Sequence, residues 1–284
     1  MIPPKYSDVL KPCNDLFSKD FPFGVRKLEV KSKAENGTEF KVSGALAEKS
    51  GAIFAEAEGK YIDKVNNLTY TDKIDTNNFF TLQVDSENAF AKGLKLSAKG
   101  SASLVSQKRS LKADLFFKQS GMFSHATADL LANDIAANVV VSQNGLLAGA
   151  EFGYSLAKGN LRASNVLVGY VAKDYTAVLS TSNLFNNISG SVFQRVNPGV
   201  LDVAFKVDYD LSKPENAVKA QVVSKYALDK TSSVKTKIGN DGLLGLGFSQ
   251  QFAKGVTLIF GAQIDLNALS ENKHKVGSSF IFNL

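Results

Sequence analysis

The sequence predicts an all-β protein: a membrane-spanning β-barrel of about nineteen strands, preceded by a short N-terminal α-helix. Apolar and polar residues alternate with a two-residue period in segment after segment, from about residue 25 to residue 282. Proline is missing between Pro22 and Pro198, as expected for hydrogen-bonded strands, whose interior needs every N–H group. No run approaches the roughly 18–20 apolar residues of a membrane-crossing helix, so we expect strands to cross the bilayer.

Composition narrows the class of protein only weakly. The 284 residues carry a formal net charge of +6 and 44% hydrophobic residues, with a mean hydropathy of -0.06, as in many soluble proteins. The positive charge favours anions, nucleic acid or acidic membrane surfaces without choosing among them. The single cysteine, Cys13, leaves no internal disulfide and no cysteine-cluster metal site. Because the N-terminus lacks a secretory signal and an Arg-rich transit peptide, we expect cytosolic synthesis, which disfavours a bacterial outer-membrane protein.

Residues 1–24 are expected to form an amphipathic helix and a hinge, ahead of a barrel over residues 25–284. Five apolar residues recur at helical spacing: Val9, Leu10, Cys13, Leu16 and Phe17. This stripe needs a surface, which could be a membrane, the barrel lumen or a partner. Pro12 fits only a first helical turn, so the regular helix should begin near Lys11 or kink there. Gly24 lets the chain turn into the first strand.

The strands follow one another as a meander. In residues 202–211 one face carries Val203, Phe205, Val207, Tyr209 and Leu211, and the other carries Asp202, Ala204, Lys206, Asp208 and Asp210. The alternation recurs in residues 79–87, 94–102, 111–119, 218–228, 233–238 and 255–266. Turn-forming pairs such as Asn36-Gly37, Asn144-Gly145 and Asp241-Gly242 separate the segments. Neighbouring strands should therefore pair antiparallel, and so large a sheet should close on itself.

The width of such a barrel predicts an open lumen. About nineteen strands enclose more space than side chains can fill, so we expect apolar residues outward and polar residues inward. In a soluble sandwich the same alternation would instead bury the apolar face in a core. The polar faces carry Lys27, Lys31, Lys33, Lys95, Lys99, Lys112, Lys118, Lys206, Lys219, Lys225, Lys235 and Lys237, against Glu29, Asp85, Asp114 and Asp208. This excess predicts a preference for anions, unless the faces simply carry solvated charges of both signs.

Asp72 breaks the pattern of its strand. Alternation places it in one row with Leu68, Tyr70 and Ile74, and hence toward lipid, where a carboxylate is energetically unfavourable. The alternatives are a rim position or a local bulge that turns the side chain inward. We expect Asp72 to point outward and to affect association or lipid contact rather than transport.

Several segments of the chain, in their order and at their spacing, resemble one known family: the mitochondrial voltage-dependent anion channels, or eukaryotic porins. The resemblance spans the whole chain. It rests on PPKYSDVLKPCNDLFSKDFPFG (3–24), KLEVKSKAENGTEF (27–40), the Gly93-Leu94-Lys95 element, GLLGLGFSQ (242–250), KGVTLIFGAQID (254–265) and HKVGSSFIF (274–282). It implies nineteen strands, parallel pairing of the first and last strands, and a helix lodged inside the pore.

The resemblance also implies a function, a set of contact residues and partners. Members are voltage-gated, weakly anion-selective channels of the mitochondrial outer membrane that pass ATP, ADP, phosphate and other small metabolites by diffusion. Carried over by position, the nucleotide contacts fall on Lys11, Lys19, Lys95, Leu243, Leu244, Gly245, Gly261, Ala262, Gln263, Ile264 and Asp265. Implied partners are outer-membrane lipids, permeant anions, the sorting and assembly machinery, a cytosolic kinase and further copies of the chain. No cofactor, metal or nucleic acid is expected.

Three details qualify the resemblance. Lys275, Gly277, Phe280 and Phe282 match the mitochondrial barrel-insertion signal, although an ordinary lipid-facing strand would show the same row. Asp72 matches in position the membrane-facing glutamate of some animal members. In those members the glutamate is associated with kinase docking, lipid binding and self-association. Departures are Pro12, Asn14, and Asp20 and Pro22 at usually glycine positions, which count against a long regular helix and a freely swinging hinge.

Other function classes fit less well. An enzyme is not expected, because His125 and His274 lie in unrelated strands and the chain has no HExxH, GxSxG or GxxxxGK[ST] motif. The nearest alternative is the pore subunit of the mitochondrial outer-membrane protein-import translocase, which should have a longer N-terminal extension and acidic lumenal patches. A soluble lipid-binding β-barrel would need fewer strands and an apolar interior.

Overall fold

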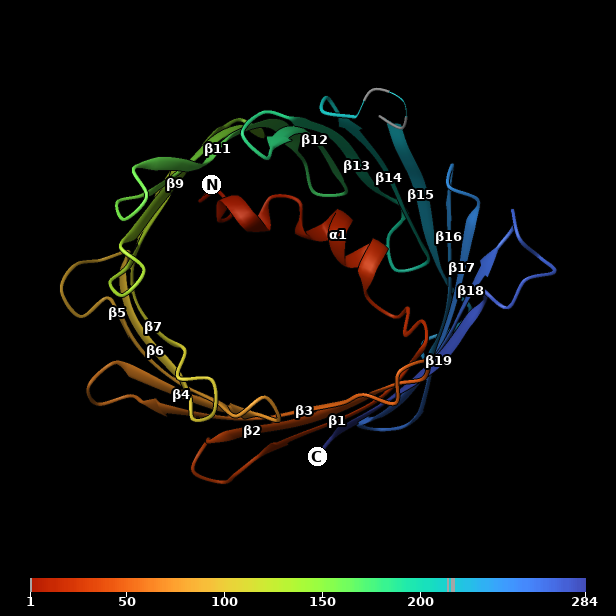
Figure 1. Cartoon of the computed structure of the whole chain (residues 1–284), viewed down its shortest axis with the longest axis horizontal. Coiled ribbons are helices and arrows are strands. Elements are labelled where there is room, and N and C mark those ends of the chain that lie inside the picture. The colour runs from red at the N-terminus through yellow and green to blue at the C-terminus, as the bar shows by residue number, and fades with distance from the viewer. Residues whose placement is uncertain (1, 214, 216–217) are drawn as a thin grey trace.

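The computed structural model describes residues 2–213, 215 and 218–284, and it shows a closed barrel with a helical segment inside it (Figure 1). That segment consists of the 3-10 turn η1 (Tyr6–Asp8) and helix α1 (Lys11–Ser18). Pro12 lies in the first turn of α1, where its missing N–H breaks no intrahelical hydrogen bond. The helix therefore begins at Lys11, as predicted. Neither helix in the described part of the chain is long and apolar enough to cross a membrane.

In the part of the chain that the structure describes, the barrel wall consists of nineteen strands that follow one another in sequence. They are β1 (Val25–Lys33), β2 (Glu39–Ala47), β3 (Ile53–Asp63), β4 (Leu68–Asp75), β5 (Phe79–Glu87), β6 (Leu94–Ser103), β7 (Arg109–Gln119), β8 (Met122–Asp129), β9 (Asp134–Gln143), β10 (Leu146–Ser155), β11 (Asn160–Val171), β12 (Tyr175–Ser182), β13 (Asn187–Asn197), β14 (Leu201–Asp210), β15 (Val218–Ala227), β16 (Ser232–Gly239), β17 (Leu243–Ala253), β18 (Val256–Asp265) and β19 (Lys275–Asn283).

Strand pairing closes the barrel, and none of the described strands is left as a free edge. Each strand pairs antiparallel with its neighbours in sequence, and β1 pairs parallel with β19, from Arg26 opposite Ser278 to Lys31 opposite Asn283. With an odd number of antiparallel strands the first and last run in the same direction, so only a parallel pair can close the ring. The predicted all-β barrel, mostly antiparallel with one parallel closure, is confirmed.

The register assigns every strand position to the lumen or to the outside. Lys235 and Lys237 reach the N-terminal segment, which lies within the ring in Figure 1, so these two positions of β16 face inward. Residues directly opposite on paired strands share a face, and following the pairs around the barrel extends the assignment. Phe205 and Tyr209 lie on the outer face and are exposed, whereas Lys206 lies on the lumenal face.

The buried apolar core lies between the N-terminal segment and the barrel wall. Val9 packs with Val140, Leu147, Leu167 and Val178 below η1, and Cys13 and Leu16 pack with Phe193, Ala204 and Val223 below α1. Among the three surfaces that the apolar stripe could use, the fold therefore provides the lumen, as the family resemblance implied.

Candidate functional site: the pore lumen

The N-terminal segment is bound to the lumenal wall by apolar burial first. Cys13 is 2% exposed, and this burial raises the pKa of its thiol above the usual range. Burial, with a smaller contribution from the charge of Glu151, raises the pKa of Tyr6 to about 12. The Tyr6 ring lies over Gly149, where an added Cβ would come within 3.1 Å of Tyr6 Cδ2. The wall is thus shaped to accept η1 and α1.

Two lysines of β16 hold the C-terminal end of the helix. Lys235 Nζ donates a hydrogen bond to the Lys19 carbonyl at 2.7 Å and lies 3.5 Å from Asp20 Oδ2. Lys237 Nζ donates to the Phe17 carbonyl at 3.2 Å. The last carbonyls of a helix form the negative end of its dipole, so two ammonium groups are favourable there. Both ammonium groups also lie over the Phe21 ring, at 5.1 and 4.8 Å from its centroid.

The hinge segment, Asp20 to Phe23, lies in a slot made by lumen-facing glycines of β17, β18 and β19. A Cβ on Gly245 would come within 2.8 Å of Phe23 Cζ, and one on Gly261 within 2.7 Å of Pro22 Cδ. At Gly247 and Gly277 it would overlap backbone carbonyl oxygens of the hinge itself. Only glycine permits this approach. The hinge is therefore held against the wall, in line with the expectation that Asp20 and Pro22 count against free swinging.

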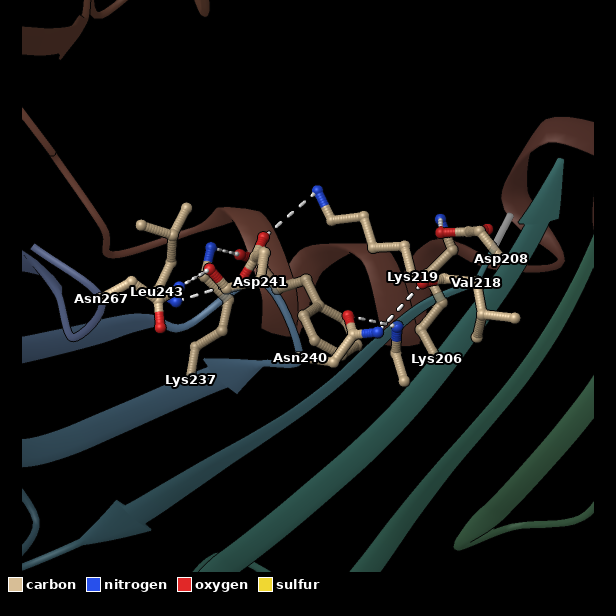
Figure 2. A network of polar contacts seen from close by, with 11 residues as sticks. Lys206, Asp208, Val218, Lys219, Lys237, Asn240, Asp241, Leu243 and Asn267 are labelled. Carbon is tan, nitrogen blue, oxygen red and sulfur yellow. Dashed lines mark hydrogen bonds and ion pairs between the residues drawn. The ribbon is translucent and has the colours of Figure 1, made fainter. Parts of the chain in front are cut away.

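The rim beside this slot is braced by a polar network, drawn in Figure 2. Asn240 bridges to β15, donating from Nδ2 to the Val218 carbonyl at 2.9 Å and accepting from the Ala220 N–H at 3.0 Å. Asp241 Oδ1 accepts from the Leu243 N–H at 3.1 Å, and Asn267 Nδ2 donates to the Asp241 carbonyl at 3.0 Å. Lys219 Nζ reaches Asp241 at 3.7 Å. The turns at this end are thereby tied to one another.

The predicted nucleotide-contacting lysines divide into two places. Lys11 and Lys19 line a cavity of ≈ 420 Å³ between the helix and β13 to β16, together with Arg195, Lys225 and Lys235. Asp8, Asp15, Asp20 and Asp202 line the same cavity. Lys95 lies on β6, where its Nζ is 3.0 Å from Asp85 Oδ2 and 5.8 Å from the Phe116 ring centroid. Sequence reasoning missed Arg195, which the fold brings to Lys11 from β13.

The predicted contacts on β17 and β18 also divide, by face. Leu243, Gly245, Gly261, Gln263 and Asp265 are on the lumenal face, and the hinge covers Gly245 and Gly261. Leu244, Ala262 and Ile264 alternate with them and lie on the outer face. The expectation of a nucleotide contact therefore cannot extend to those three side chains. The reason is that successive side chains of a strand point to opposite faces, so the side chains of consecutive residues cannot all face the lumen.

The lumenal charge is more evenly matched than the sequence count suggested. Each lysine assigned to the lumen lies on the lumenal face, but so do acids beyond the four that were counted: Glu39, Glu56, Glu58, Glu87, Asp129, Asp134, Glu151 and Asp202. On β1 to β4 these acids pair with lysines, and Lys73 lies 3.0 Å from both Glu56 and Glu58. The count of four acids was too low because it left out the polar rows of β2 and β3 and single acids on β5, β8, β9, β10 and β14. The polar rows of β2, β3 and β4 also add three lysines, Lys41, Lys60 and Lys73. Basic charge is instead concentrated on β15 and β16, where Lys225 lies opposite Lys235.

Asp72 lies on the outer face of β4. The pairing of residues 68–74 with β3 and β5 runs without a register shift and places Asp72 between Gly59 and Leu82. A Cβ on Gly59 would come within 2.8 Å of Asp72 Oδ1, so the carboxylate lies over the glycine. Tyr70 and Ile74 share its row, and Tyr61 of β3 stacks on Tyr70 with ring centroids 6.4 Å apart.

The remaining candidates lie in ordinary strand and rim positions. Lys275 and Gly277 are lumenal, whereas Phe280 and Phe282 are on the outer face, in the row that begins with Val276. His125 lies in the lumen, with Nε2 2.8 Å from Asp114 Oδ1 and its ring stacked on Phe116 at 4.2 Å. His274 lies near the rim, where Nδ1 accepts from the Asp265 N–H at 3.2 Å. Among the described residues, no group of three or more His, Cys, Asp or Glu side chains could hold a metal ion.

A closed barrel with an apolar outer wall, a charged lumen and its own N-terminal helix docked inside defines a β-barrel pore protein. The family model described as eukaryotic porin matches residues 2–277. The chain belongs to the eukaryotic porin family.

Curated relatives cover nearly the whole chain. The "Mitochondrial outer membrane protein porin" of Neurospora crassa is 36% identical, with 99% of each chain covered. The "Voltage-dependent anion-selective channel" of Drosophila melanogaster is 33% identical, with 98% of each covered. The human "Non-selective voltage-gated ion channel VDAC2" is 31% identical over 97% of this chain and 93% of the relative. A solved mutant of Rh. blastica porin shares the fold alone, with a TM-score of 0.50 and 10% identity over 91% of this chain and 95% of the other.

Proposed function

We propose that the protein is a voltage-gated, weakly anion-selective channel of the mitochondrial outer membrane, through which ATP, ADP, phosphate and other small metabolites diffuse. The single observation that carries the proposal is the lumen: a closed nineteen-stranded barrel whose basic β15–β16 wall faces a docked N-terminal helix. The relatives named mitochondrial porin and voltage-dependent anion-selective channel support the compartment and the voltage dependence.

The cavity beside the helix supports nucleotide passage in particular. Lys11, Lys19, Arg195 and Lys225 surround it, and ammonium and guanidinium groups attract phosphates. The carboxylates on the same cavity keep the attraction modest, because they lower the local positive potential. A permeant anion must be able to leave as readily as it enters, and a mixed lining of this kind suits transit better than tight binding.

Contacts outside the lumen belong to the same proposal. Outer-membrane lipids cover the apolar face. Asp72, which lies on the outer face over Gly59, is proposed to affect self-association, lipid contact or docking of a cytosolic kinase rather than transport. Lys275, Gly277, Phe280 and Phe282 of β19 are proposed as the signal that the sorting and assembly machinery reads.

Planar-bilayer recording of the purified protein tests the proposed function. In a gradient of potassium chloride, we expect a small reversal potential whose sign shows that chloride is more permeant than potassium. We also expect the channel to close at both voltage polarities. ATP as the only anion on one side should carry measurable current. A fully open channel that prefers cations would contradict the proposal and favour a protein-import pore. Extraction of the protein from membranes without detergent would contradict both the proposed channel and a protein-import pore.

A further inference from the structure

One end of the barrel carries an apolar rim on the side that runs from β6 to β13. Figure 1 shows where these strands lie in the ring. The turns after β6, β8, β10 and β12 lie at the same end, because each follows an even-numbered strand of an antiparallel meander. Their exposed apolar residues are Leu104, Val105, Leu130, Leu131, Leu156, Leu184 and Phe185. We call these seven residues the apolar rim. Leu104, the most exposed, is 81% exposed.

The backbone of the apolar rim is held in place by hydrogen bonds. Backbone hydrogen bonds tie its turns to neighbouring strands and turns: the Leu130 N–H donates to the Leu111 carbonyl at 2.8 Å, and the Leu156 N–H donates to the Asn133 carbonyl at 2.8 Å. Asn183, Leu184 and Phe185 have φ of 53°, 55° and 68°, the left-handed region that leucine and phenylalanine rarely adopt. Backbone preference therefore does not explain the apolar side chains of that turn.

The charges within the turns of the apolar rim are basic, and two acids, Asp129 and Asp134, flank the turn 130–133 from the lumenal face of β8 and β9. The turn residues 104–108, 130–133, 156–159 and 183–186 include Lys108 and Lys158 and no acidic residue. At the opposite end, β7 to β14 are joined in pairs by turns built on Ser120-Gly121, Asn144-Gly145, Lys173-Asp174 and Pro198-Gly199. Exposed apolar residues are fewer there: Val200 follows Pro198-Gly199, and Phe90 lies in the turn between β5 and β6. A surface that combines exposed leucines with lysines suits the boundary between phosphate headgroups and acyl chains.

The apolar rim is also continuous with the outer wall. On β10 the outward row runs from Leu146 through Phe152 to Tyr154, and Leu156 follows in the turn. Ten residue steps of about 3.3 Å, at a tilt of about 40°, span about 25 Å of membrane depth, which is the height of the apolar band of a barrel. With Leu146 at one limit of the hydrocarbon layer, Leu156 falls at the other.

We propose that the apolar rim is embedded in one leaflet of the membrane, at the boundary between headgroups and acyl chains, and anchors this side of the barrel at a fixed depth. The inference rests on the proposed membrane location and is independent of what the pore transports. The opposite ends of β7 to β13, whose turns carry fewer exposed apolar residues, lie in water.

Tryptophan fluorescence tests the proposal directly, because the chain contains no tryptophan. Leu131→Trp and Leu156→Trp each place one reporter in the apolar rim. In phosphatidylcholine vesicles brominated on the acyl chain near the ester, we expect at least twofold quenching and blue-shifted emission for both. Val65→Trp, on an 89% exposed turn at the opposite end, is the matched control and should be quenched by aqueous acrylamide instead. Phe205→Trp, on the outer face of β14, reports whether the barrel is in the membrane.

Each outcome decides the proposal. Quenching of Phe205→Trp without quenching of either rim variant would overturn the embedded rim while the membrane location stands. Rim variants shielded from both bromolipid and acrylamide would show that protein, such as a second copy of the chain, covers the turns, and would also overturn it. If Phe205→Trp itself is not quenched, the proposed membrane location fails, and the embedded rim fails with it.

Discussion

Single glycines decide where the hinge can lie. Gly245, Gly247, Gly261 and Gly277 come from three strands, yet the lumenal face of each is in contact with the segment from Asp20 to Val25. Glycines within a strand, as in GLLGLG, indicate close packing rather than a phosphate-binding turn, but the local sequence does not identify what packs there. The partner lies more than 200 residues away in the chain, so only the closed barrel brings the two together.

Gly261→Ala should displace the hinge. The added Cβ would lie 2.7 Å from Pro22 Cδ, and overpacking of this kind typically costs about 1–3 kcal/mol. Loss of hinge contacts should loosen the helix and expose Cys13, which is measured as a faster reaction with a maleimide. Gly44→Ala and Gly190→Ala are matched controls, because an added Cβ at either position meets no atom within 4 Å. Unchanged Cys13 reactivity in Gly261→Ala would contradict the slot.

Asp72→Asn should leave ion selectivity unchanged. Its side chain is on the outer face, separated from the lumen by the wall, so removing the charge does not alter the field that permeant ions experience. We expect an unchanged reversal potential and altered self-association, measured by crosslinking in liposomes. A strongly shifted reversal potential would place the carboxylate in the lumen and end this interpretation.

Helix α1 is positioned by elements that are distant in sequence. Its apolar side packs on β13, β14 and β15, and its C-terminal carbonyls are bound by Lys235 and Lys237 of β16. Local sequence predicts the helix and its start at Lys11 correctly, because periodicity and Pro12 are local signals. It leaves three surfaces open for the apolar stripe. Tertiary packing selects the lumen.

Lys235→Met should weaken the docking of α1. The change keeps most of the side-chain volume but removes the hydrogen bond to the Lys19 carbonyl and the ion pair with Asp20. A hydrogen bond from a charged donor contributes roughly 1.5–3 kcal/mol, so Cys13 should react at least about tenfold faster with a thiol reagent. Lys99→Met, on the lumenal face of β6 away from the helix, is the control. Equal rates in the two variants would show that β16 does not hold the helix.

The docking of η1 should weaken at alkaline pH. Burial raises the pKa of Tyr6 from 10.0 to about 12, so the docked state holds the phenolic proton more strongly than the free state does. The stabilisation is fully present below pH 10 and is lost as the pH rises toward 12. Cys13 should therefore become more reactive over this range in the wild type than in Tyr6→Phe. Comparing the two proteins at the same pH cancels the titration of the thiol, and identical profiles would contradict the assignment.

Selectivity belongs to the whole molecule, because it reflects the summed charge of the lumenal face. Acids and bases nearly balance around the wall, so a modest change in charge should be visible. Lys99 and Lys112 lie directly opposite each other on β6 and β7 and both face the lumen.

Lys99→Glu combined with Lys112→Glu should shift the reversal potential toward cations. The two changes alter the lumenal charge by four elementary units, which in a nearly balanced pore reverses the sign of the local field. Bilayer recording in a salt gradient measures the shift, and raising the ionic strength should reduce it by screening. An unchanged reversal potential would show that this part of the wall does not set selectivity.

By itself the sequence determined the strands, the faces of strands such as residues 202–211, the start of the helix and, through its resemblance to a family, the parallel closure. These follow from local periodicity or from position along the chain, and an alternation of two residues can be recognised without knowing any partner. Only the tertiary structure decided that Asp72 lies over Gly59, that Leu244, Ala262 and Ile264 face outward from a predicted contact run, and that acids of β2 and β3 offset the lumenal lysines. It alone placed Pro22 against Gly261 and Gly277. Register and ring closure set these contacts, and both depend on every strand at once.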